Sequence, residues 1–126
     1  MLPKKILRPC AFIANTHPST KPGEHWVAIY VSPKGKGEYF DSYGLPPLQK
    51  DIKNYMEEQC PNGWKYNPFV LQDANSFTFG YYCVLYVISK SHGLKFCTFV
   101  KLFYKNKLVN DIMVYNLVKE NTKCIQ

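Results

Sequence analysis

Three polar side chains in this sequence have the types and positions that acyl-transfer chemistry needs. His25 opens an apolar segment in PGEHWVAIY, and Asp41 ends the next one in EYFDSYG. If these segments are strands joined by the turn SPKGKG, their far ends lie side by side, and the Asp41 carboxylate can accept a hydrogen bond from the imidazole and orient it. Gln72 ends NPFVLQ, where its amide could donate to an oxyanion. Taken singly, each residue has an ordinary structural role as its alternative.

The stretch NSFTFGYYCVLYVI, residues 75–88, predicts the place of a nucleophile. A polar turn runs through Gly80 into an apolar segment, which indicates a loop entering a buried helix. A thiol at such an N-terminus, near an imidazole, has its pKa lowered towards a reactive thiolate. Phe79 stands there instead, and a phenyl ring has neither a proton to give nor a lone pair to attack with. Cys83 lies one turn later, about 6 Å along the axis, and is the alternative nucleophile, although attack needs near-contact geometry.

Five segments provide the frame for these residues. Apolar, β-branched and aromatic patterns predict strands at 10–15, 26–31, 37–42 and 64–72, the second and third forming an antiparallel hairpin. The segment 79–91 is apolar nearly all round, which predicts a central helix buried against the sheet. The layout is α+β, an antiparallel or mixed sheet around a central helix with helices at the C-terminal end.

Three further helices are predicted from apolar spacing. The first begins at about residue 47 and ends before PNG, and the others cover 95–104 and 107–120. Each of two helices has a predicted buried face: Leu48, Ile52, Tyr55 and Met56 in the first, and Leu108, Ile112, Tyr115 and Val118 in the last.

Composition narrows the class of protein. A length of 126 residues with 46% hydrophobic content fits one domain over residues 1–126. No apolar run reaches the roughly 18 residues of a membrane span, and no signal-peptide cleavage pattern appears, so we expect an intracellular protein without membrane contact. Five cysteines without a CxxC pair indicate neither a zinc site nor a disulfide framework, and nothing predicts a metal or cofactor.

The net charge of +7 comes from fifteen lysines and Arg8. Lysine attracts phosphate without reading bases, so non-specific contact with DNA is one interpretation, and a merely soluble lysine-coated surface is the simpler one.

Two strings resemble a known family. CAFIANTHPSTKPGEHWVAIYVSPKGKGEYFDSYG and LQDANSFTFGYYC are similar to the adenovirus-type, or adenain-like, cysteine proteases, especially those of Polinton (Maverick) DNA transposons, as is NDIMVYNLV. The resemblance covers roughly residues 8–119. It implies a papain-like fold, a polypeptide substrate or peptide ligand, and a location in the cytoplasm, the nucleus or a virus-like particle. Some members use DNA and a small peptide as activators. Members usually begin with a helical segment, which this chain is expected to lack.

Matched by motif, the family's histidine is His25, its acidic partner is Asp41 and its oxyanion-hole glutamine is Gln72. The family's cysteine belongs seven residues after that glutamine, which is Phe79. The resemblance therefore implies a pseudoprotease that has lost its nucleophile. The alternatives are an active peptidase that uses Cys83 and a small basic nucleic-acid-binding module.

Overall fold

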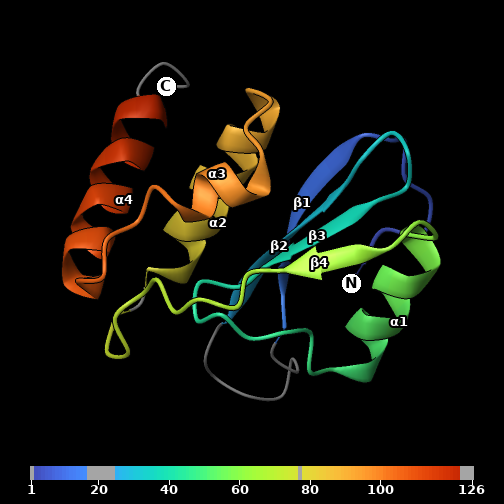
Figure 1. Cartoon of the computed structure of the whole chain (residues 1–126), viewed down its shortest axis with the longest axis horizontal. Helices are drawn as coiled ribbons and strands as arrows, with labels where there is room; N and C mark the ends of the chain where they lie inside the picture. The colour runs from blue at the N-terminus through green and yellow to red at the C-terminus, as the bar shows by residue number, and fades with distance from the viewer. Residues whose placement is uncertain (1, 17–24, 77, 123–126) are drawn as a thin grey trace.

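The computed structural model describes residues 2–16, 25–76 and 78–122, except the side chain of Phe79. A sheet in the order β1-β2-β3-β4 has α1 on one face and α2, α3 and α4 on the other (Figure 1). This arrangement confirms the α+β prediction. The elements are β1 (Cys10–Asn15), β2 (Trp26–Val31), β3 (Gly37–Phe40), α1 (Lys50–Gln59), β4 (Trp64–Tyr66), α2 (Phe79–Ser91), α3 (Phe96–Val100) and α4 (Lys107–Thr122).

The first three strands form an antiparallel meander. β1 pairs with β2 from Cys10 opposite Val31, and β2 pairs with β3 from Val31 opposite Gly37. Gly35 closes the turn between β2 and β3 at a φ of 73°, a conformation that glycine adopts without strain. The predicted strands at 10–15 and 26–31 and the hairpin are confirmed, while the third strand ends at Phe40 rather than at residue 42.

β4 is much shorter than the predicted strand at 64–72. It pairs in parallel with β3 over only three residues, Trp64 to Tyr66. The ladder stops at Asn67-Pro68, because proline has no N–H to donate and the Asn67 side chain bonds to the Phe69 backbone instead. Gln72 therefore lies in an irregular segment and not at a strand end.

α1 covers one face of the sheet. The alternate β2 residues Val27, Ile29 and Val31 point to this face and pack with Ile52 and Met56 of the helix. Leu48 does not belong to this face as predicted: it precedes the helix and is 75% exposed. Pro46 and Pro47 explain the later start, because they favour extended backbone before the helix begins at Lys50.

α2 covers the other face as the predicted central helix. Tyr82, Cys83 and Tyr86 are buried against Ala28 and Phe40 of the sheet. None of residues 80–90 is exposed, which confirms that this helix is covered nearly all round. Aromatic rings fill the space behind it, with Phe40 stacked on Tyr86 at a centroid distance of 5.0 Å.

Two predictions for the C-terminal helices are wrong. α3 covers only Phe96–Val100 of the predicted 95–104. On α4 the buried residues are Asn110, Asp111, Val114 and Val118, whereas Leu108, Ile112 and Tyr115 of the predicted face are exposed. The helix turns polar side chains inward because they have partners there: the Asn110 amide donates to the Leu71 carbonyl, and Asp111 accepts from the Tyr82 hydroxyl.

A largely buried ion pair joins the sheet to α2. Glu38 of β3 accepts from Lys90 Nζ at 3.1 Å and from the Tyr86 hydroxyl, and Lys90 also lies over the Tyr30 ring. The Lys90 and Glu38 side chains are only 9% and 12% exposed. These contacts therefore offset the free-energy cost of removing both charges from water. Either charge without the other would destabilise the fold.

We expect Lys90→Met to lower the free energy of unfolding by about 3 kcal/mol, because it leaves the largely buried Glu38 carboxylate without its paired cation. The double variant Glu38→Gln/Lys90→Met should recover most of that loss. Urea unfolding of the wild type and both variants measures this. A single variant no less stable than the double one would contradict the expectation.

Candidate active site

His25 and Asp41 form the hydrogen bond that the sequence predicts. His25 precedes β2 and Asp41 follows β3, and the register that sets Ala28 opposite Phe40 brings these ends together. His25 Nε2 lies 2.7 Å from Asp41 Oδ2. Asp41 is 2% exposed and the His25 side chain is 16% exposed. The pair is thus shielded on the carboxylate side and reachable from solvent on the imidazole side.

Tyr43 holds both members of this pair. Its backbone N–H donates to Asp41 Oδ1 at 2.7 Å, so both carboxylate oxygens are engaged. Its ring stacks on the His25 imidazole with centroids 5.7 Å apart and planes 15° from parallel. Since Asp41 binds Nε2, a proton taken from a nucleophile would be accepted at Nδ1. The arrangement can therefore serve as an oriented general base.

Gln72 is fully buried between the Asp41 turn and the loop that precedes α2. Its Oε1 accepts from Ser42 Oγ at 2.5 Å. Its Nε2 donates to Ser76 Oγ at 2.9 Å and to the Ser76 carbonyl at 3.2 Å. Gln72 does not face solvent, but an oxyanion would have to replace Ser76 as its acceptor. Its role as an oxyanion donor stays a prediction.

α2 begins at Phe79, as the sequence predicts. Thr78 is its N-cap residue, and Thr78 Oγ1 lies 3.0 Å from Ser76 Oγ. The polar chain Ser42–Gln72–Ser76–Thr78 thus runs from the residue after Asp41 to the start of the helix. The Phe79 side chain lies outside the described residues, so its assignment to the nucleophile position stays a prediction.

Cys83 is poorly suited to act as a nucleophile. It is fully buried in the core between α2 and the sheet. Burial, together with the negative charge of Asp41, raises the pKa of its thiol well above the ordinary value. A buried thiol that stays protonated is neither nucleophilic nor accessible.

Sequence reasoning missed Ser42 and Tyr43. Their signal was present in EYFDSYG, because residues directly after a strand that ends in a candidate carboxylate lie beside it. The stacking of Tyr43 on His25 also follows from the hairpin register, which sets residue 43 level with residue 25.

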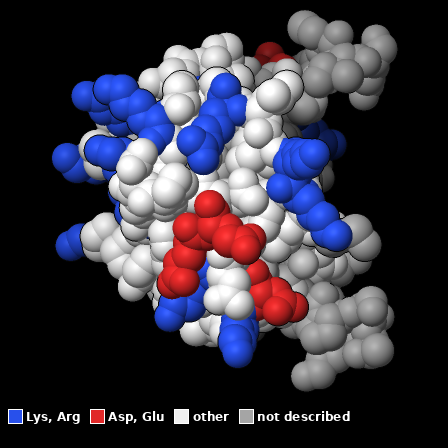
Figure 2. All heavy atoms as spheres, turned by 90° about the vertical axis from the view of Figure 1, so that its right-hand side faces the viewer, with Lys and Arg blue, Asp and Glu red and all other residues white. Residues whose placement is uncertain are grey.

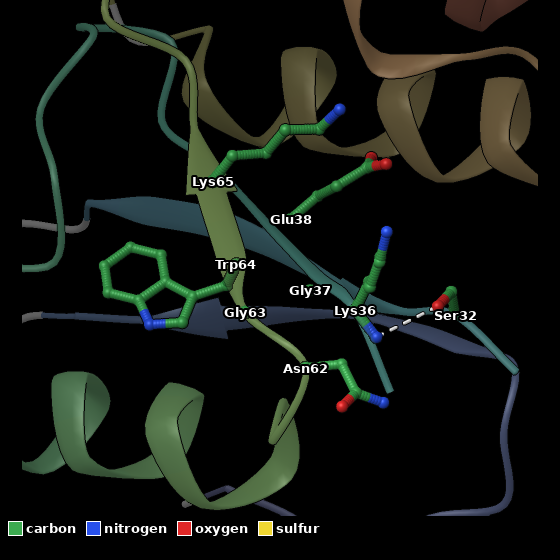
Figure 3. Close-up of a pocket in the computed structure, with 8 residues that line it drawn as sticks. All are labelled: Ser32, Lys36, Gly37, Glu38, Asn62, Gly63, Trp64 and Lys65. Atoms are coloured by element: carbon green, nitrogen blue, oxygen red, sulfur yellow. Dashed lines mark hydrogen bonds between the residues drawn. The ribbon is translucent and has the colours of Figure 1, made fainter. Parts of the chain in front are cut away.

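A pocket lies on the sheet away from this pair. Lys36, Glu38 and Lys65 project into a pocket of about 490 Å³ at the β3–β4 edge, while the Trp64 side chain points away from it (Figure 3). The Glu38 carboxylate there is already bound to Lys90 and Tyr86. Within residues 2–16, 25–76 and 78–122, no group of three or more His, Cys, Asp or Glu side chains is arranged to hold a metal ion.

The charge on the α1 side of the molecule is mixed. Figure 2 shows acidic side chains grouped on this face with basic side chains above and below them. The acidic group interrupts the basic surface there, and DNA contact stays a prediction. No described helix combines the length and apolar character of a membrane span.

An α+β fold with a mixed four-stranded sheet and an oriented His–Asp pair is compatible with a cysteine-protease-like domain. Sequence comparison supports the same class. The chain is similar to a cysteine protease of African swine fever virus, with 46% identity over 50 residues, which is 35% of this chain and 18% of the viral protein. The chain thus spans a minor part of that relative. No family model matches the sequence, and no solved structure matches it.

Proposed function

We propose that this chain is an adenain-like cysteine protease domain, of transposon or viral origin, that cannot hydrolyse peptides because Phe79 stands at its nucleophile position. The observation that carries the proposal is the His25–Asp41 hydrogen bond of 2.7 Å, next to a series of side-chain hydrogen bonds from Ser42 through Gln72 to the start of α2. The partial similarity to a viral cysteine protease supports the class of protein.

The chemistry follows from what each residue can supply. Asp41 orients the imidazole and stabilises the imidazolium that would form. His25 could take a proton, but a phenyl ring has none to give, and no acyl-enzyme can form on carbon. Burial raises the pKa of Cys10 and Cys60 as well as that of Cys83, so these thiols stay protonated. The active-peptidase alternative through Cys83 is disfavoured on these grounds.

The proposed function is therefore recognition without cleavage. A polypeptide segment would be bound beside the His25–Asp41 pair and released intact. Contact with DNA through the surface lysines would be an additional, sequence-independent property.

An activity-based cysteine-protease probe tests the proposal on the wild-type protein. We expect no labelling above that of His25→Ala, and no cleavage of a peptide library, because position 79 carries no thiol and burial keeps Cys10, Cys60 and Cys83 protonated. Labelling of any wild-type cysteine that depends on His25 would refute the loss of activity.

A further inference from the structure

Asn67 is a fully buried asparagine whose polar groups are all engaged with backbone. Its Nδ2 donates to the Asp41 carbonyl at 3.1 Å and to the Phe69 carbonyl at 2.9 Å. Its Oδ1 accepts from the Phe69 N–H at 2.9 Å. One side chain thus ties the segment after β4 to the residue that orients His25.

The same two segments are in close contact at a second point. Gly44 has a φ of 73°, and a Cβ built there would lie 2.7 Å from the Phe69 carbonyl carbon. The Gly44 N–H also donates to the Asp41 carbonyl at 2.9 Å. The Asp41 backbone is therefore fixed by its own turn on one side and by Asn67 on the other.

The Asp41 carboxylate can reach His25 only from a defined backbone position. A hydrogen bond of 2.7 Å does not tolerate a shift of its acceptor by an ångström, because its strength falls steeply with distance and angle. Asn67 does not touch the imidazole, and it is the described side chain that bonds to the Asp41 carbonyl.

We infer that Asn67 is a positioning residue for the His25–Asp41 pair, acting through the Asp41 backbone. The inference rests on the proposed site but not on hydrolysis, since the pair is present with or without a nucleophile. Loss of the Asn67 amide should loosen the pair even where the fold survives.

Asn110 provides a matched control. It is also a fully buried asparagine, with Nδ2 donating to the Leu71 and Tyr104 carbonyls and Oδ1 accepting from the Tyr104 N–H. Its bonds join α4 to other loops and do not involve Asp41. If Asn67 had only a structural role, Asn67→Ala and Asn110→Ala would have the same effect on the His25–Asp41 hydrogen bond.

The experiment is nuclear magnetic resonance of the His25 ring N–H in the full chain, assigned by its loss in His25→Gln. The wild type and Asn110→Ala should show a downfield ring N–H signal that exchanges slowly, because Asp41 accepts the proton in a shielded position. In Asn67→Ala the signal should disappear, or the ring proton should exchange with solvent at least about tenfold faster. A tenfold change corresponds to the loss of about one buried hydrogen bond. Amide spectra establish that each variant is folded, and Asn67→Ser replaces the alanine variant if it is not.

A folded Asn67 variant with wild-type exchange of the ring proton would overturn the inference, as would an equal change in Asn110→Ala. The proposed function fails by a different result, which is His25-dependent labelling of a wild-type cysteine. That result would not change the ring N–H signal or its dependence on Asn67.

Discussion

In the variant Phe79→Cys, the thiol at position 79 is expected to be more reactive than the native cysteines of this protein. The new side chain stands at the N-terminus of the thirteen-residue α2, where the helix dipole favours the thiolate. An imidazole oriented by Asp41 provides a second stabilising charge when it is protonated. At mildly acidic pH an ordinary thiol is under about 1% thiolate, so alkylation by iodoacetamide should be roughly 100-fold faster at position 79.

Two control variants define this result. His25→Ala combined with Phe79→Cys should react more slowly than Phe79→Cys alone, because the imidazolium is gone and only the helix dipole still favours the thiolate. Ser91→Cys provides an exposed thiol at the opposite end of the same helix, where the dipole disfavours the thiolate. If Phe79→Cys reacts no faster than Ser91→Cys, the start of α2 is not a nucleophile site.

Stability is expected to collapse between pH 10 and pH 12. Burial raises the pKa of Tyr55 to about 12 from its ordinary value of 10.0. Burial also raises the pKa of Tyr39, Tyr82 and Tyr86, with added contributions from nearby Asp41, Asp111 and Glu38 respectively. These four tyrosines stay protonated in the folded protein, whereas an unfolded chain loses their protons above pH 10.

The unfolded state thus binds fewer protons than the folded state in this window, and the free energy of unfolding falls as pH rises. Each tyrosine contributes about 1.4 kcal/mol per pH unit, so four together contribute roughly 5 kcal/mol per unit. A domain of ordinary stability, about 5–15 kcal/mol, should therefore unfold in this range.

Alkaline titration followed by circular dichroism and by tyrosinate absorbance measures this. The two signals should change together for the buried tyrosines. Tyr39→Phe should reduce the pH dependence by about a quarter, since one of four such groups is removed. The exposed Tyr104→Phe should leave it unchanged. Ionisation of the buried tyrosines before any loss of structure would contradict the prediction.

Strong local patterns account for the parts of the fold that sequence predicts. CAFIAN and WVAIYV have apolar, branched residues bounded by turns, and both are strands with the predicted bounds. The glycines in SPKGKG favour the hairpin turn, and the hairpin register brings His25 close to Asp41. The helix 79–91 was predictable because an apolar segment of that length without proline has to be buried.

The wrong predictions have two causes: local bonds that end an element early, and tertiary partners that turn polar side chains inward. In WKYNPFVLQ, the Asn67 side chain and Pro68 end a strand that apolar content alone would continue. On α4, the polar Asn110 and Asp111 face inward because groups far away in the sequence bind them. The spacing of apolar residues does not predict such partners. The hydrogen bond from Asn67 to the Asp41 carbonyl joins residues 26 positions apart, so no local sequence pattern predicts it.

Gln72 is buried and hydrogen-bonded at both ends of its amide, so the folded domain needs it even if the site has no catalytic activity. Both ends of its amide bind serines on two loops, so its loss would leave the buried Ser42 hydroxyl without its acceptor, at about 1–3 kcal/mol. Folding alone is therefore a sufficient reason for this residue, whether or not any peptide is cut. The same holds for Asp41, whose two carboxylate oxygens bind His25 and the Tyr43 N–H. A protein can lose catalysis by a change at one position and still keep the polar set around it, because folding alone requires that set.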